Sequence, residues 1–291
     1  MKRLEILKTY KLYIGGKFPR TESGRFHAYM SGKKHVANVC RASRKDFRDA
    51  EGSARSAQVD WWRKTAYNRS QILYRIAEMM EGRKEQFIEE LILQGHTKAK
   101  ALAEVEKSID RWIYHAGWCD KYQQLFSSVN PVASAHFNFS VLEPTGVVCL
   151  VPKPGEALLG IVSMIAPAIA AGNSVIVLCD LKSPLSVITL SEVLHTSDLP
   201  GGVVNVLTGE LSELLPHVSV HMDVNAIVYA GDDKEQLKSL QLDAATNVKR
   251  IIKVDSAELN STEDPYLIRE MSEVKTTWHP IEQIGASGSG Y

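Results

Sequence analysis

The side chains best suited to nucleophilic or metal chemistry in this sequence are its four cysteines. A thiolate can attack a carbonyl carbon, and clustered thiolates bind zinc. The four are Cys40, Cys119, Cys149 and Cys179. None stands in a C-x-x-C pair, so we expect no zinc cluster and no other metal site. Cys149 and Cys179 lie inside apolar runs, where a thiol usually behaves as a small buried hydrophobic group.

A glycine-rich segment near the end of the chain has the composition of a phosphate loop. It contains Gly285-x-x-Gly288-x-Gly290, but it neither follows a predicted strand nor opens a helix. A phosphate loop needs both, because the helix N-terminus holds the anion. We therefore expect Ile284–Tyr291 to fray rather than to bind phosphate.

Composition excludes several classes of partner. The 291 residues carry 34 Lys and Arg against 34 Asp and Glu, so the formal net charge is zero. Phosphate backbones need a basic face, so we expect no nucleic acid partner. The longest apolar stretch, near Ala157–Ala171, is shorter than the roughly 20 residues that span a bilayer, and no secretory signal is visible. We expect a cytoplasmic protein with no membrane partner.

Strand and helix patterns alternate in the second half of the chain. The predicted strands are Val147–Val151, Ser174–Cys179, Val203–Leu207, Ala226–Tyr229 and Arg250–Val254; the predicted helices are Leu158–Ala171, Leu185–His195, Leu211–His217 and Lys234–Thr246. Such alternation with short connections predicts an α/β fold with a doubly wound, mostly parallel sheet. Ligands of these sheets bind at the carboxyl ends of the strands.

Helical spacing dominates the first half of the chain. Ser43-x-x-Asp46 can cap a helix start, and apolar residues then recur every three or four positions. A second helical region is predicted around Ile72–Ile92, either as one continuous helix or as two successive helices. A third helix is predicted over Lys98–Tyr122. Lys11–Lys17 contains a Gly-Gly turn and predicts a hairpin.

The stretch Leu142–Asp180 resembles the cofactor domain of the aldehyde dehydrogenase superfamily. It reads Glu143-Pro144-Thr145-Gly146-Val147-Val148 and then Ile165-Ala166-Pro167-Ala168-Ile169-Ala170-Ala171-Gly172-Asn173. Leu199–Val206 and Asn247–Arg250 also follow in the family's order. The resemblance implies a Rossmann-like cofactor domain with an N-terminal helical part and a small oligomerisation sheet.

The resemblance places the family's nucleotide contacts on residues that cannot make them. The Lys and Glu that hold the ribose hydroxyls correspond to Leu178 and Leu181, which form no side-chain hydrogen bond. The family's Gly-x-Gly reads Gly209-Glu210-Leu211, and its Thr-Gly-Ser reads Ala230-Gly231-Asp232. We interpret Asp232 as an ordinary helix N-cap. With Pro152, the positions Leu178, Leu181, Gly209 and Gly231 are vestiges of a cofactor site. We expect no cofactor; NAD(P) binding is the alternative.

The family's catalytic residues are missing as well. Its Pro-Trp-Asn-Phe-Pro segment reads Pro152-Lys153-Pro154-Gly155-Glu156-Ala157, one residue longer and without the Asn that donates to the oxyanion. Val254 stands in the place of the general base, and a valine takes no proton. The family's nucleophile is a later cysteine, but none follows Cys179. The resemblance therefore predicts a chain with no catalytic residue, inactive alone.

A final match to the family explains why this chain is shorter than full-length members. Ser272–Thr277 resembles the strand near the C-terminus of full-length family members, yet Asp255–Met271 is too short to hold a catalytic domain. The chain most resembles the truncated, Cys-less second repeat of family 16 aldehyde dehydrogenases and separate bacterial short forms. We divide it into an N-terminal helical part (1–132), an oligomerisation strand region (133–144), a Rossmann-like part (145–257) and a C-terminal strand with its tail (258–291).

Two functions follow from this reading. The first is a non-catalytic subunit that binds a like chain or a full-length aldehyde dehydrogenase. Its predicted interface consists of Phe137, Phe139, Val141, Val274 and Thr276, with Phe139 and Val274 on one apolar face. The alternative is an NAD(P)-binding oxidoreductase component whose catalytic domain comes from a partner. Unpaired strand edges favour the first, because they add a partner strand readily.

Overall fold

The computed structural model describes residues 6–281, and its centre is a five-stranded parallel sheet. The strand order is β10-β9-β6-β7-β8. The bounds are β6 Val147–Val151, β7 Ser174–Cys179, β8 Val204–Thr208, β9 Ala226–Tyr229 and β10 Arg250–Lys253. All neighbouring pairs are parallel, which confirms the predicted α/β, doubly wound class. The glycine-rich segment 284–291 lies outside the described residues.

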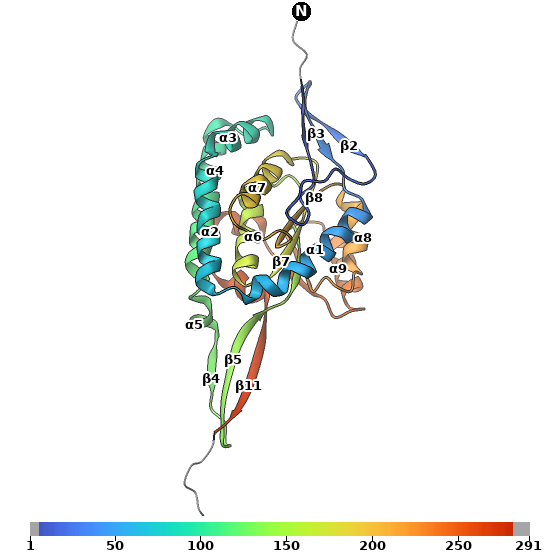
Figure 1. Ribbon diagram of the computed structural model, residues 1–291. Coiled ribbons are helices and arrows are strands. Elements are labelled where there is room, and N and C mark those ends of the chain that lie inside the picture. The colour runs from blue at the N-terminus through green and yellow to red at the C-terminus, as the bar shows by residue number, and fades with distance from the viewer. Residues whose placement is uncertain (1–5, 282–291) are drawn as a thin grey trace, which may run out of the picture.

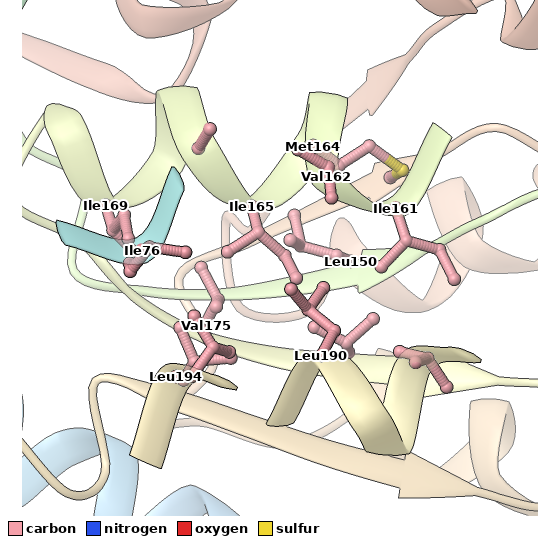
Figure 2. Packing of buried hydrophobic residues seen from close by; sticks show 14 of the residues in the cluster. Ile76, Leu150, Ile161, Val162, Met164, Ile165, Ile169, Val175, Leu190 and Leu194 are labelled. Carbon is pink, nitrogen blue, oxygen red and sulfur yellow. The ribbon is translucent and has the colours of Figure 1, made fainter. Parts of the chain in front are cut away.

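Helices cover both faces of this sheet (Figure 1). One face carries α1 Arg44–Arg63, α8 Leu211–Ser219 and α9 Lys234–Ala244; the other carries α6 Leu159–Ala170 and α7 Leu185–His195, with α2 Ala66–Glu81, α3 Lys84–Leu93 and α4 Lys98–Trp118 outside them. Figure 2 shows Ile161, Ile165 and Ile169 of α6 directed into the space between α6 and α7, where Leu190 and Leu194 lie. Because α6 is buried all round, its sequence is apolar without helical periodicity.

The helix boundaries follow local chemistry. Ser43 and Asp46 form the predicted capping box at the start of α1. Gly172 ends the α6 segment with a φ of +96°, a conformation that glycine adopts without steric cost. The third predicted helix is too long: α4 ends at Trp118, and Tyr122 begins a separate short helix, α5 Tyr122–Phe126.

A small sheet near the N-terminus was not predicted from the sequence. It consists of β1 Lys8–Tyr10, β2 Phe26–Ser31 and β3 Lys34–Cys40, in the order β1-β3-β2. The predicted Gly-Gly turn is present as a single bridge between Ile14 and Lys17, with φ of +61° and +74° at Gly15 and Gly16. This sheet covers the body near β8 (Figure 1).

The third sheet is an arm that extends away from the body (Figure 1). It contains β4 Ser128–Asn130, β5 His136–Pro144 and β11 Ser272–Pro280, in the antiparallel order β11-β5-β4. The predicted strand at Val274–Thr277 is thus part of a nine-residue strand. Short helices α10 Ser256–Ser261 and α11 Tyr266–Glu270 join the body to this strand.

No helix within residues 6–281 is both long and apolar enough to cross a lipid bilayer.

Candidate functional site

The structure brings the five vestigial cofactor positions to one edge of the parallel sheet. Pro152 follows β6, Leu178 and Leu181 lie at the end of β7, Gly209 follows β8, and Gly231 lies two residues past β9. Because β6 pairs with β7 and β9, and β7 with β8, these strand ends are neighbours. This is the carboxyl edge at which doubly wound sheets bind ligands. The side chains that occupy it decide its chemistry.

The two leucines at the end of β7 belong to the hydrophobic core. Leu178 is completely buried in the cluster on the α1 side of the sheet. Leu181 is partly buried against the cluster on the α6 side. Between them, Asp180 accepts hydrogen bonds from the N–H of Gly155 (2.9 Å) and the N–H of Lys182 (3.1 Å). The carboxylate of Asp180 therefore holds the loops that contain Gly155 and Lys182 in place.

A carboxylate from another helix occupies the N-terminus of α6. Oε1 of Glu104, on α4, accepts from the N–H groups of Leu158 (3.0 Å) and Leu159 (3.1 Å). The first amides of a helix attract anions. Glu104 accepts from two of these amides, so those two are not available to a developing oxyanion or a phosphate. No sequence signal points to Glu104, because it lies 54 residues before the helix that it caps.

A second carboxylate lies in the loop where the family carries its oxyanion-binding Asn. Glu156 accepts hydrogen bonds from the hydroxyl of Ser256 and from Nδ2 of Asn260 (3.2 Å). Both partners belong to the short helix α10. The loop thus closes onto α10 through a negative group, which is opposite in charge to the donor that an oxyanion requires.

Protein groups pack closely against the carboxyl ends of β8 and β9. The N–H of Ala42 donates to the carbonyl of Thr208 (2.8 Å), so the segment before α1 lies over Gly209. A Cβ on Gly209 would meet the backbone N of Ala42 at 3.4 Å. At Gly231, a Cβ would come within 2.5 Å of the Tyr229 ring. The Tyr229 ring therefore leaves no room for a Cβ at position 231, whereas at position 209 the nearest atoms lie at 3.3 Å or more and a Cβ would require only a small shift.

The interpretation of Asp232 as a helix cap is wrong. The N-cap of α9 is Asp233, whose Oδ1 accepts from the N–H groups of Glu235 and Gln236 at 3.0 Å each. Asp232 instead pairs with Nζ of Lys153 at 2.7 Å. The helix starts at Lys234, as the sequence predicts, so the cap is the aspartate directly before that residue and not the one before it.

Val254, in the place of the family's general base, borders a small cavity between α4, α6 and α10. The cavity has a volume of about 200 Å³, and its wall includes Arg111, His115 and Ser163. These three side chains are 5%, 2% and 1% exposed. His115 is buried beside Arg111, and this burial, with the arginine charge, lowers the pKa of His115 to about 3. The histidine is neutral at physiological pH.

This histidine is expected to make the fold acid-sensitive. The imidazole titrates near 6.5 when unfolded and near 3 when folded, so unfolding takes up a proton between these values. The free energy of unfolding is therefore unaffected by the titration of this histidine above pH 6.5. It decreases as the pH drops below that value, by about 2 kcal/mol at pH 5. Urea unfolding at pH 7.5 and pH 5 should show this loss in the wild type and not in His115→Gln. The exposed His27 supplies the control, His27→Gln, which should follow the wild type; equal losses in all three proteins would contradict the assignment.

None of the cysteines has the surroundings of a nucleophile. All four are buried and free. Burial raises the pKa of Cys119 and of Cys149 to about 12, and it raises the pKa of Cys179 as well. A reactive thiolate needs a lowered pKa and access to substrate. The expectation that Cys149 and Cys179 are buried in strands is confirmed.

The arm presents two different faces. Antiparallel partners share a face, and β5 pairs Phe139 with Thr277 on β11 and with Val129 on β4. We call this side, with Val129, Phe137, Phe139 and Val141, the phenylalanine face. Val129 is 68% exposed and Phe137 45% exposed, and these residues border a shallow hollow against α5.

The prediction that Phe139 and Val274 share a face is wrong. Val274 pairs with Leu142, and Thr276 pairs with Ser140, so both lie on the face opposite Phe139. That opposite face carries a polar chain in which Asn130 donates to Asn138 (2.6 Å) and to Ser140 (2.9 Å). It also exposes Trp278, which the sequence analysis did not select. The strand β4 was missed because three residues give no alternation to detect.

Comparison with known proteins agrees with this fold. Cytosolic 10-formyltetrahydrofolate dehydrogenase from Mus musculus is 29% identical over 258 residues, which are 86% of this chain and 29% of that protein. Mitochondrial benzaldehyde dehydrogenase from Antirrhinum majus is 27% identical over 273 residues, 91% of this chain and 49% of that protein. The NAD+ complex of an aldehyde dehydrogenase from Bacillus cereus superposes with a TM-score of 0.78 at 23% identity, over 84% of this chain and 50% of that one.

This chain therefore spans half or less of the length of these relatives. The sequence pattern of the aldehyde dehydrogenase family matches residues 25–261, which include the parallel sheet and all the vestigial positions. The chain belongs to the aldehyde dehydrogenase family.

Proposed function

We propose that this chain is a non-catalytic family member that associates, through its arm, with a second copy of itself or with a full-length aldehyde dehydrogenase. The observation that carries the proposal is the phenylalanine face, which leaves Val129 and Phe137 in water at the end of an extended sheet. Exposed apolar patches of this kind mark interaction surfaces.

The edges of the arm support the same function. Within the described residues, β11 and β4 each have a strand partner on one side only. β11 is nine residues long, and its side chains from Glu273 to Thr276 are exposed. A long, unpaired strand can accept a strand from another chain by backbone hydrogen bonding. Val274 and Thr276 would take part in such an interface from the edge rather than from the phenylalanine face.

The carboxyl edge of the parallel sheet supports the non-catalytic part of the proposal. Leu178 and Leu181 pack into or against the core, and Glu104 caps α6. Val254 offers no base, and each described cysteine is buried. The chemistry of aldehyde oxidation needs a nucleophile, a base and oxyanion donors together. At the family positions for these roles, the described residues offer a valine in place of the base and no accessible thiol.

The proposal is tested by activity and sedimentation measured on the same preparation. The chain alone, with NAD+ or NADP+ and a panel of aldehydes, should reduce no more nicotinamide than a protein-free blank. Sedimentation velocity should show a dimer or larger species, or a new complex after addition of a full-length dehydrogenase from the same cells. A chain that stays monomeric under both conditions would remove the subunit function. Turnover that persists after contaminating dehydrogenases are removed would instead favour the NAD(P)-binding oxidoreductase alternative.

A further inference from the structure

A cluster of possible metal ligands lies at the opposite end of the parallel sheet from the vestigial cofactor positions. Glu51 belongs to α1, and His221 and Asp223 lie in the loop between α8 and β9. One carboxylate oxygen of Glu51, one imidazole nitrogen of His221 and one carboxylate oxygen of Asp223 lie within 4.8 Å of one another. About 170 residues separate the glutamate from the other two, so no spacing in the sequence reveals the cluster.

The buried glutamate is the unusual member of this group. Glu51 is 6% exposed, and its Oε1 is fully buried without a hydrogen-bond partner among the described residues. Burial raises the pKa of Glu51, whereas the nearby His221 opposes that rise. A carboxylate held out of water without a partner is costly, and a bound cation removes that cost.

The nearby cationic side chain, that of Arg55, donates its hydrogen bonds to groups other than Glu51. Arg55, one turn further along α1, donates from Nη2 to the carbonyl of Asp223 and to Oδ1 of Asn225 (2.7 Å). These bonds fix the loop that carries His221 and Asp223 against α1. No hydrogen bond or ion pair joins Arg55 to Glu51 in the described structure. The arginine therefore positions the loop, and its charge opposes the rise in the pKa of Glu51 without binding that carboxylate directly.

Two contacts fix the position of the His221 ring. Its ring packs edge-on against Phe47, with ring centroids 5.5 Å apart. The N–H of Asp223 approaches Nδ1 of His221 at 3.3 Å, which favours the tautomer with its proton on Nε2. The lone pair of Nδ1 is then the one that a metal ion would take, in place of this long hydrogen bond. The carboxylate of Asp223 lies beside it and is exposed to solvent.

We propose that Glu51, His221 and Asp223 bind one divalent transition-metal ion, for which Zn²⁺ is the probe. One imidazole and two carboxylates are ligands that zinc and similar ions accept, whereas an imidazole is foreign to the all-oxygen sites of Mg²⁺ and Ca²⁺. Water would complete the coordination on the exposed side. The ion would join the middle of α1 to the loop before β9.

Titration with Zn²⁺ tests this site on the full chain after removal of any affinity tag. We expect saturable binding of one ion per chain by calorimetry, and a Zn²⁺-dependent rise in melting temperature that EDTA reverses. Glu51→Gln and His221→Gln should each weaken binding by at least about tenfold. His217→Gln is the matched control: this histidine lies near the same loop but outside the cluster, and its loss should leave the isotherm unchanged.

Glu51→Gln also separates a metal site from a simple ion pair. If the glutamate is a metal ligand, the variant without metal should be at least as stable as the metal-free wild type, because an unpartnered buried charge is removed. If Arg55 or protonated His221 neutralises the glutamate, the variant should be less stable, and Zn²⁺ should not raise the melting temperature of either protein. That second result, or equal Zn²⁺ affinity in the wild type and Glu51→Gln, would overturn the proposal.

Discussion

Replacing Val129 and Phe139 together by lysine should dissociate the assembly formed through the arm. The two residues pair across β4 and β5, so the variant places two charges at the centre of the phenylalanine face. Burying one apolar side chain of this size contributes about 1.5–3 kcal/mol. Losing two such contributions should weaken association by roughly a hundredfold to ten-thousandfold. Sedimentation equilibrium over a concentration series measures the effect directly.

Variants elsewhere on the surface make this test specific. Tyr67→Lys changes an aromatic side chain that is 70% exposed on α2, outside the arm, and should leave the dissociation constant unchanged. Val274→Lys changes the opposite face, which a partner would reach only around the edge of β11, so we expect a smaller effect. Circular dichroism and urea unfolding should show that each monomer remains folded. Wild-type-like association of the Val129/Phe139 variant would exclude the phenylalanine face as the interface.

The strands β6, β7 and β9 of the central sheet could be predicted from the sequence because they are buried on both sides. For β6, β7 and β9 the predicted and observed bounds are identical, and so are those of α7. Each strand is a short, continuous apolar run, and Gly146 and Gly172, both with positive φ, mark neighbouring turns. By contrast, most residues of β2 are exposed, and its sequence lacks a clear alternation. The small N-terminal sheet was missed for that reason.

Relations between distant segments could not be predicted in the same way. Alternation along β5 puts Phe137, Phe139 and Val141 on one face, as expected, but only the register with β11 decides on which side Val274 lies. Glu104 reaches the start of α6 from a helix that is separate in the sequence. The resemblance to the family predicts which nucleotide contacts are absent, while the structure shows which side chains lie at those positions.

The side chains at the carboxyl edge of the parallel sheet should weaken nucleotide binding strongly. We expect NAD+ and NADP+ to bind about a thousandfold more weakly than to a full-length family member measured in parallel. By the family resemblance, Leu178 and Leu181 stand in the places of the residues that bind the ribose hydroxyls, and each buried polar group left unpaired costs about 1–3 kcal/mol. Two such losses, near 4 kcal/mol together, correspond to a factor of about a thousand in the dissociation constant. The carboxylates of Glu104 and Glu156 add repulsion toward any phosphate near α6.

Calorimetry with both nucleotides measures this loss, and two substitutions show why it is not easily reversed. Leu178 is completely buried, so Leu178→Lys should destabilise the chain by several kcal/mol rather than restore a ribose contact. Leu181 is only partly buried, and Leu181→Glu should be tolerated better, because a carboxylate there can reach water. Neither variant should gain measurable affinity, since the start of α6 stays capped by Glu104. Micromolar NAD+ binding by the wild type would refute this account and would favour the NAD(P)-binding oxidoreductase alternative, because the frame at the carboxyl edge would then still work as a cofactor site.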